Sequence, residues 1–365
     1  MNFRIKNNHL LYFTTLGVWI ITVLIKLKYN GLIFGFDYGL YHPDGTLYTT
    51  RALDWSGYTE TEAAKIVSDW YNIHAYKFNS TNPSDFYYSV NHLYADYAPR
   101  VLYPLLSTPF VKLFGVIGML VIPALSLLIV MLMITKIGIE LNKTFASLLT
   151  LIMISSSATV LRWMMINTTD ALLVGIFSVV TFYLSKKISN FNWFFIFGAL
   201  IVLTSLTRLS ILFWFAIAFV LLMQGKVQKT TFILVFSVIS VVPTLLNNSS
   251  SSFLTVESQR GILQRILLYP YYVLKITFYE FAQLFVLDRI LFFICVLSLL
   301  YSVKHFYKDS SKYLIFIFAA GILTGALNGT VGVNFRYQLP VITFICWSLI
   351  DNISFSPKRF LRIVK

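Results

Sequence analysis

The residues best suited to chemistry stand close together, just after the first apolar stretch of the chain. Asp37, His42 and Asp44 place two carboxylates and an imidazole within eight positions. Such side chains can take a proton from a hydroxyl group or bind a divalent metal. The alternative is structural, because Pro43, Asp44 and Gly45 are residue types that favour an ordinary polar turn. The residues alone leave both interpretations open.

Charged residues also stand at the ends of later apolar stretches. Arg100 and Arg336 each precede one, where a guanidinium can bind two phosphate oxygens, although either arginine alone is more often an anchor at lipid headgroups. Arg208 interrupts the apolar segment 191–223 and predicts the turn of a helical hairpin. Asp170 begins an apolar run, where an acidic residue stabilises a helix N-terminus. Charge is costly to bury near a membrane, so each position is a candidate functional site.

The elements that must position these residues are transmembrane helices. The chain has 365 residues, of which 57% are hydrophobic and 12% charged, more apolar surface than a soluble core can bury. A helix of about 20 apolar residues crosses a bilayer. We therefore predict an all-α, polytopic membrane protein, a single transmembrane domain over residues 1–365 with about ten spans. The predicted spans are 10–28, 115–135, 145–161, 170–185, 191–206, 209–223, 230–246, 289–303, 313–327 and 338–352.

Charge asymmetry between the loops predicts the orientation of these spans. With a cytoplasmic N-terminus, the inward loops contain 15 basic residues against 3 acidic ones. The first outward loop, residues 30–98, contains 3 basic and 8 acidic residues, so 3 − 8 gives −5. The positive-inside rule therefore predicts that both termini are cytoplasmic. The basic residues are scattered singly, so the net charge of +14 does not indicate a nucleic-acid partner.

Two outward segments are predicted to cover the extracytoplasmic face. In the first loop, Thr59 and Glu62 have the spacing of a capping box, and an amphipathic interfacial helix is predicted over 59–77. Its apolar face is predicted to contain Ala63, Ile66, Val67, Trp70 and Ile73. The second segment is 247–288. The charged residues that this topology gathers at one face are Asp37, Asp44, Asp96, Arg100, Arg162, Asp170, Arg208 and Arg336.

In their order along the chain, these segments resemble the GT-C superfamily of integral membrane glycosyltransferases, which use lipid-linked sugars as donors. Asp44, Tyr48 and Ala52 match a D-x-x-x-Y-x-x-x-A pattern in the family's first outward loop. The other matching motifs are 100–104 before an apolar segment that ends at 114–115, 169–171, 206–208 and 336–340. The order of the motifs, rather than any one of them, carries the resemblance.

The resemblance implies an activity and a set of site residues. It implies inverting transfer of a sugar from a polyprenyl-phosphate donor to a glycolipid, polysaccharide or protein acceptor. Asp44 would be the catalytic base, with Asp37 as the alternative, and Arg100, Arg208 and Arg336 would bind the donor phosphate. The full candidate substrate-binding set is His42, Tyr48, Asp96, Arg100, Tyr103, Asp170, Arg208, Arg336 and Tyr337. No cofactor is expected, and no ligand spacing supports a divalent metal.

Other functions remain open at this point. A polysaccharide polymerase or ligase also joins lipid-linked sugars, but its large polar loop is expected later in the chain than 30–98. A lipid-linked sugar transporter or flippase would need polar residues near the midplane and discontinuous helices. A purely structural role ranks third. The composition is compatible with a bacterial inner (plasma) membrane, although an endoplasmic reticulum protein would have a similar topology.

Overall fold

Helices make up the regular structure of the described chain. The computed structural model describes residues 2–29, 44–74, 100–186, 189–208, 210–248, 269–328 and 335–352, and these ranges contain no strand. The all-α prediction is confirmed for them. Three candidate site residues, Asp37, His42 and Asp96, lie outside the described residues.

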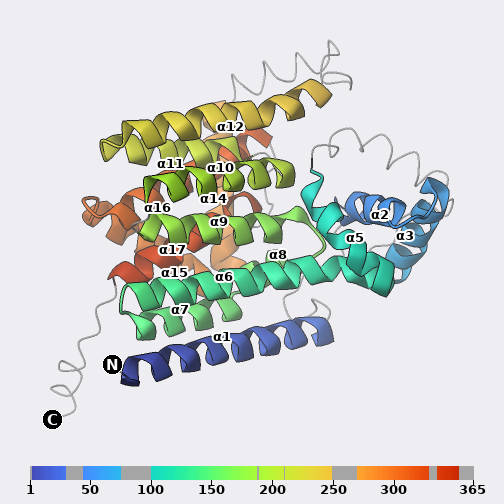
Figure 1. The fold of residues 1–365 in the computed structure, drawn as a ribbon, viewed down its shortest axis with the longest axis horizontal. Coiled ribbons are helices and arrows are strands. Elements are labelled where there is room, and N and C mark those ends of the chain that lie inside the picture. The colour runs from blue at the N-terminus through green and yellow to red at the C-terminus, as the bar shows by residue number, and fades with distance from the viewer. Residues whose placement is uncertain are drawn as a thin grey trace.

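The main body is a bundle in which most helices lie side by side along one direction (Figure 1). Each predicted span overlaps one of its helices. The helices of the bundle are α1 (Asn2–Tyr29), α6 (Val121–Glu140), α7 (Thr144–Ser156), α9 (Thr169–Ser185), α10 (Asn190–Thr207), α11 (Ile211–Met223), α12 (Val227–Asn248), α14 (Tyr269–Leu287), α15 (Arg289–Lys304), α16 (Asp309–Asn328) and α17 (Val341–Asn352).

Several helices are compatible with a multi-pass membrane protein. Among the described residues, three helical stretches are long and apolar enough to cross a membrane: Asn8–Lys28, Leu102–Glu140 and Asn190–Thr207. A fourth exists if α7 and α8 (Ala158–Met164), which meet at a bend of 74°, form one broken span. Four further apolar helices are shorter, namely Thr169–Ser185, Ile211–Met223, Val227–Ser240 and Val341–Asn352. The predicted total of about ten spans therefore stays a prediction.

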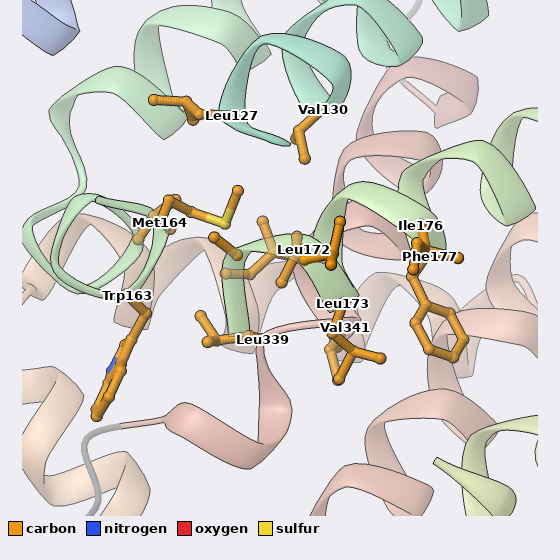
Figure 2. Packing of buried hydrophobic residues seen from close by; sticks show 14 of the residues in the cluster. Leu127, Val130, Trp163, Met164, Leu172, Leu173, Ile176, Phe177, Leu339 and Val341 are labelled. Atoms are coloured by element: carbon orange, nitrogen blue, oxygen red, sulfur yellow. The ribbon is translucent and has the colours of Figure 1, made fainter. Parts of the chain in front are cut away.

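Helix α9 lies at the centre of the bundle. Figure 2 shows Leu172 and Leu173 of α9 between Leu127 and Val130 of α6 on one side and Val341 of α17 on the other. Buried residues occur all around α9, which is the pattern of a helix packed on every side. This packing fixes the first turn of α9, where Asp170 stands.

Three helices cover one end of the bundle, which we call the site end. They are α2 (Asp44–Trp55), α3 (Glu60–His74) and α5 (Leu102–Phe114), and they lie at the right of Figure 1. The turn considered for 43–45 is not the structure at Asp44, because this residue begins α2. Helix α5 continues through a 3-10 segment, η2 (Gly115–Leu120), into α6, so the helix predicted to begin at residue 115 becomes α-helical at residue 121.

The amphipathic helix of the first loop is present as α3. Its capping box is confirmed, because the Thr59 backbone N–H donates to the Glu62 carboxylate at 2.9 Å. Helix α3 packs against α2 through a face centred on Val67 and Tyr71, which are fully buried, whereas Ile73 is 77% exposed. The apolar face was predicted to lie at the membrane interface, so the place of Ile73 on that face stays a prediction.

A further helix occupies part of the predicted second outward segment. Helix α14 covers Tyr269–Leu287 and packs against α15 and α16. The Tyr269 hydroxyl donates to the Leu323 carbonyl oxygen at 3.0 Å. The segment 247–288 therefore contributes a packed helix to the bundle, a role that the sequence analysis did not predict.

Candidate functional site

A buried cluster of ion pairs connects four distant parts of the chain. Arg336 Nε donates to Asp170 Oδ2 at 2.9 Å, and Arg336 Nη2 lies 2.7 Å from Asp44 Oδ2. Arg208 pairs with the other oxygen of Asp170. Asp170 is 1% exposed, and Arg208 and Arg336 are 8% and 9% exposed. We call these four residues the Asp170 cluster.

Each member of the Asp170 cluster stands at the end of a helix. Asp44 begins α2 and Asp170 lies in the first turn of α9, where the helix dipole favours a carboxylate. Arg208 follows α10 directly, which confirms the predicted turn between α10 and α11. Arg336 opens the short 3-10 segment η3 (Arg336–Gln338) that leads into α17. Helix ends thus bring together residues that the sequence separates widely.

Asp170 lies in the first turn of α9 and also accepts hydrogen bonds from other side chains. The residue that precedes α9, Thr168, donates its hydroxyl to Asp170 Oδ2 at 2.9 Å. The same carboxylate accepts from both arginines, so each of its two oxygens has a donor within the protein. Asp170 therefore organises the cluster, whereas Asp44, whose side chain is 23% exposed, is its accessible carboxylate.

The backbone that presents Arg336 has an unusual conformation. Phe335 has φ +63°, in the left-handed region that bulky residues rarely adopt. Its N–H donates to the carboxylate of Glu280, a residue of α14 that is 1% exposed. The unpredicted helix α14 thus holds the turn in which Arg336 points at Asp170. Glu280 is a site residue that the sequence analysis missed, because nothing local connects it to position 336.

Aromatic rings cover both arginines of the cluster. The guanidinium carbon of Arg336 lies 4.9 Å from the centre of the Trp163 ring, and that of Arg208 lies 4.4 Å from the Tyr337 ring. A planar guanidinium packs well on an aromatic face. Tyr337 was a candidate on sequence grounds. Trp163 of α8 was not, and its role depends on the bend between α7 and α8.

Arg100, Tyr48 and Tyr103 form a second group at the site end. Arg100 Nη1 donates to the Tyr48 hydroxyl at 3.2 Å, and the Tyr48 and Tyr103 rings meet edge to face at 5.5 Å. The Tyr103 hydroxyl donates to the Met119 carbonyl oxygen at 2.8 Å. Tyr48 stands on α2 one helical turn after Asp44. The group of Arg100, Tyr48 and Tyr103 therefore lies beside the Asp170 cluster.

A close approach at Gly45 brings α2 to the start of α9. An added Cβ at Gly45 would lie 2.3 Å from the side chain of Asn167, so no larger residue fits there. Asn167 is fully buried and its amide donates to the hydroxyl of Tyr71 on α3. Gly45 therefore has a packing role. It allows Asp44 to reach Arg336.

The electrostatics of the cluster favour its charged forms. Burial alone would lower the pKa of Arg336, but the carboxylates of Asp170 and Asp44 outweigh burial and hold that pKa above its ordinary value. The same guanidinium lies 2.7 Å from Asp44 Oδ2. In the described part of the chain, no group of three or more His, Cys, Asp or Glu could hold a metal ion.

Comparison with known proteins adds no relative. No family model, no curated protein and no solved structure matches the chain. The fold and the site define a helical protein with several apolar helices long enough to span a membrane and a buried ion-pair cluster at one end of its bundle.

Proposed function

We propose that this protein is an integral membrane glycosyltransferase of the GT-C type. It moves a sugar, with inversion, from a polyprenyl-phosphate donor to a glycolipid, polysaccharide or protein acceptor. The observation that carries the proposal is the meeting of Asp44, Asp170, Arg208 and Arg336 in one cluster. These residues belong to four separate motifs of the resemblance. If they form one site, that explains why all four motifs are present in the same chain.

The chemistry needs one base and a stabilised leaving group. The Asp44 carboxylate takes the proton of the acceptor hydroxyl while that oxygen attacks the anomeric carbon of the donor. The bond between this carbon and the phosphate oxygen breaks, and its electron pair leaves on the phosphate. Arg336 holds the Asp44 carboxylate in place through the contact of 2.7 Å between Nη2 and Oδ2. Asp37, outside the described residues, remains the alternative base.

We place the site end on the extracytoplasmic face of the inner (plasma) membrane, with cytoplasmic termini and about ten spans. The basic residues of the inward loops support this orientation. The opposite end of the bundle holds Lys143, Lys186 and Lys308, as the positive-inside rule expects.

The test is the lipid-linked sugar profile of cells that produce the wild type, Asp44→Asn, Asp37→Asn or the control Asp69→Asn. Asp69 lies on the exposed face of α3, so its variant should behave as the wild type. Loss of the base should make donor accumulate and the glycosylated product disappear. Size-exclusion chromatography of each purified variant checks folding. If both Asp44→Asn and Asp37→Asn fold and keep the wild-type profile, the proposed function is wrong.

A lipid-linked sugar transporter is the second candidate, because one observation favours it. The bend of 74° between α7 and α8 is a discontinuity of the kind that transporters use near their substrate. Proteoliposomes with labelled lipid-linked sugar distinguish the two. A transferase moves no label across the bilayer without acceptor, whereas a transporter does.

A further inference from the structure

A polar pocket lies between α1, α6 and α9 at the end of the bundle opposite the site end. Its volume is about 330 Å³. The residues that bring polar groups to its lining are Tyr12, Lys136, Glu140, Tyr183 and Lys186. No step of the proposed reaction uses these residues. We call this the Lys136 pocket.

The ends of two packed helices and the edge helix α1 build the Lys136 pocket. Lys136 and Glu140 are four positions apart near the end of α6, so they lie on the same face of that helix. Tyr183 lies in the last turn of α9, and Lys186 directly follows α9. Helix α6 packs against both α9 and α1, and α1 lies at the edge of the bundle (Figure 1). Tyr12 of α1 completes the pocket.

The Lys136 pocket contains hydrogen-bond donors that the described chain does not use. The Lys136 ammonium lies 5.7 Å from the centre of the Phe182 ring. Within the described residues, neither this ammonium nor the hydroxyls of Tyr12 and Tyr183 make a hydrogen bond or an ion pair. Three donors without an acceptor in the described chain therefore line one pocket.

The charge of the Lys136 pocket favours an anion. Of the described residues that line it, Lys136 and Lys186 are positive and Glu140 is negative, so 2 − 1 gives +1. Glu140 is paired with Lys186 at 2.8 Å, so the remaining positive charge belongs to Lys136, which is half-buried. An ammonium beside two phenolic hydroxyls suits a phosphate, because phosphate oxygens accept several hydrogen bonds and an ionic contact at once.

The surroundings of the pocket favour a phospholipid as the source of this phosphate. Tyr12 belongs to the candidate span Asn8–Lys28, and Phe13 and Leu16 beside it are 71% and 39% exposed. Acyl chains can lie along these apolar side chains while the headgroup enters the pocket. Tyrosine and lysine are typical of the ends of membrane spans, and basic pockets between spans at the cytoplasmic surface bind anionic headgroups.

We propose that the Lys136 pocket binds the phosphate of an anionic phospholipid. Lys136 makes the ionic contact, and the hydroxyls of Tyr12 and Tyr183 donate to phosphate oxygens. The headgroup thereby connects α1, at the edge of the bundle, to α6 and α9 in its interior. With the orientation proposed above, this lipid belongs to the cytoplasmic leaflet. The binding itself needs no sugar transfer.

The experiment measures binding of phosphatidylglycerol to the purified full chain in neutral detergent by native mass spectrometry. Lys136→Met keeps the apolar stem but removes the charge, and it should weaken binding roughly tenfold or more because a charged hydrogen bond is lost. Tyr12→Phe and Tyr183→Phe each remove one hydroxyl and should weaken binding about threefold. Lys136→Arg keeps the charge and should still bind. If Lys136→Met and both tyrosine variants bind as the wild type does, the proposal is overturned.

Lys304→Met is the matched control for charge. Lys304 is exposed at the end of α15, at the same end of the bundle as Lys308, and it does not line the Lys136 pocket. Its variant removes the same charge and should bind phosphatidylglycerol as the wild type does. If it weakens binding as much as Lys136→Met, the lipid responds to the overall charge of this end and the proposal is wrong.

Glu140→Gln tests the sign of the charge that the pocket accepts. This variant removes the negative charge from the lining, so phosphatidylglycerol should bind more tightly. Weaker binding would mean that the carboxylate helps to hold the lipid, and the assignment of an anion would be wrong. Excess inorganic phosphate should leave phosphatidylglycerol bound. Its displacement would assign the pocket to free phosphate and overturn the assignment to a lipid.

Thermal unfolding provides an independent readout. Phosphatidylglycerol should raise the Tm of the wild type, because it binds the folded chain. This increase should be lost in Lys136→Met, whereas the Tm of that variant without lipid should stay near the wild-type value. An increase that survives in Lys136→Met would contradict the proposal. Sugar transfer depends on Asp44 or Asp37 and this readout on Lys136, so the proposed function and the inference can fail separately.

Discussion

The two ends of the bundle use the same chemistry in different surroundings. At the site end, Asp170 binds two arginines with almost no exposure to solvent. At the opposite end, Lys186 and Glu140 form an ion pair at 2.8 Å, with side chains 42% and 45% exposed. Water and salt screen the exposed pair, whereas the buried one depends on every partner being present. We therefore expect burial, rather than the number of ion pairs, to decide which charges the fold depends on.

Removing the central carboxylate should have the largest effect. Asp170→Asn leaves Arg208 and Arg336 buried without their main counter-ion, and we expect the free energy of unfolding to fall by about 3–5 kcal/mol. Thermal unfolding in detergent measures the change. A loss no greater than that of an exposed pair would contradict the importance of burial.

The second largest effect is expected at the junction of α8 and α15, beside the site. Asp288 is buried and accepts from the Ser157 hydroxyl at 2.6 Å, from the Thr159 N–H at 3.0 Å and from the Leu291 N–H at 3.0 Å, so one carboxylate caps both α8 and α15. Asp288→Ala should cost about 2–3 kcal/mol of unfolding free energy. It should also increase hydrogen exchange in α8, which carries Arg162 and Trp163. Unchanged exchange there would show that the cap does not hold α8.

The exposed pair at the opposite end should respond weakly. Glu140→Gln removes the partner of Lys186, and we expect a change within about 0.5 kcal/mol that becomes smaller as salt is added. The same unfolding assay as for Asp170→Asn makes the two ends directly comparable. A loss above about 2 kcal/mol would contradict the expected screening.

We expect the smallest effect at Glu62, which is exposed although it lies at the site end. This residue tests whether exposure to solvent or position in the bundle determines how much an interaction stabilises the fold. The Thr59 N–H and hydroxyl lower the pKa of the Glu62 carboxyl. The stabilisation of α3 is therefore complete above the pKa of the unfolded chain and is lost as the pH falls through the lower, folded-state value. Hydrogen exchange at the start of α3 should differ between wild type and Glu62→Ala near neutral pH. The two should converge as Glu62 is protonated, and a difference that persists in acid would contradict this account.

The sequence predicts helices far better than it predicts the contacts between their ends. Apolar length located the bundle helices other than α14, and the spacing of Thr59 and Glu62 predicted the start of α3. The same reasoning did not predict that α3 packs against α2 through Val67 and Tyr71, because spacing alone does not tell which side of a short helix meets its neighbour.

The candidate site was predicted in part. Asp44, Asp170, Arg208 and Arg336 were singled out from the sequence, but as separate positions, and the pairing of Asp170 with both arginines was not predicted. Trp163 and Glu280 were missed as site residues. Each acts through a contact with a residue far away or in another helix, and no local pattern records such a contact.

The spacing of the Asp170 contacts also sets an order in which the site can be completed during synthesis. Asp170 and Arg208 are 38 positions apart, so their pair can form once the hairpin of α10 and α11 has been made. Arg336 is 166 positions from Asp170 and follows α16 in the chain. The nascent protein can therefore make the bundle helices α1 to α16 before Asp44 gains its arginine partner.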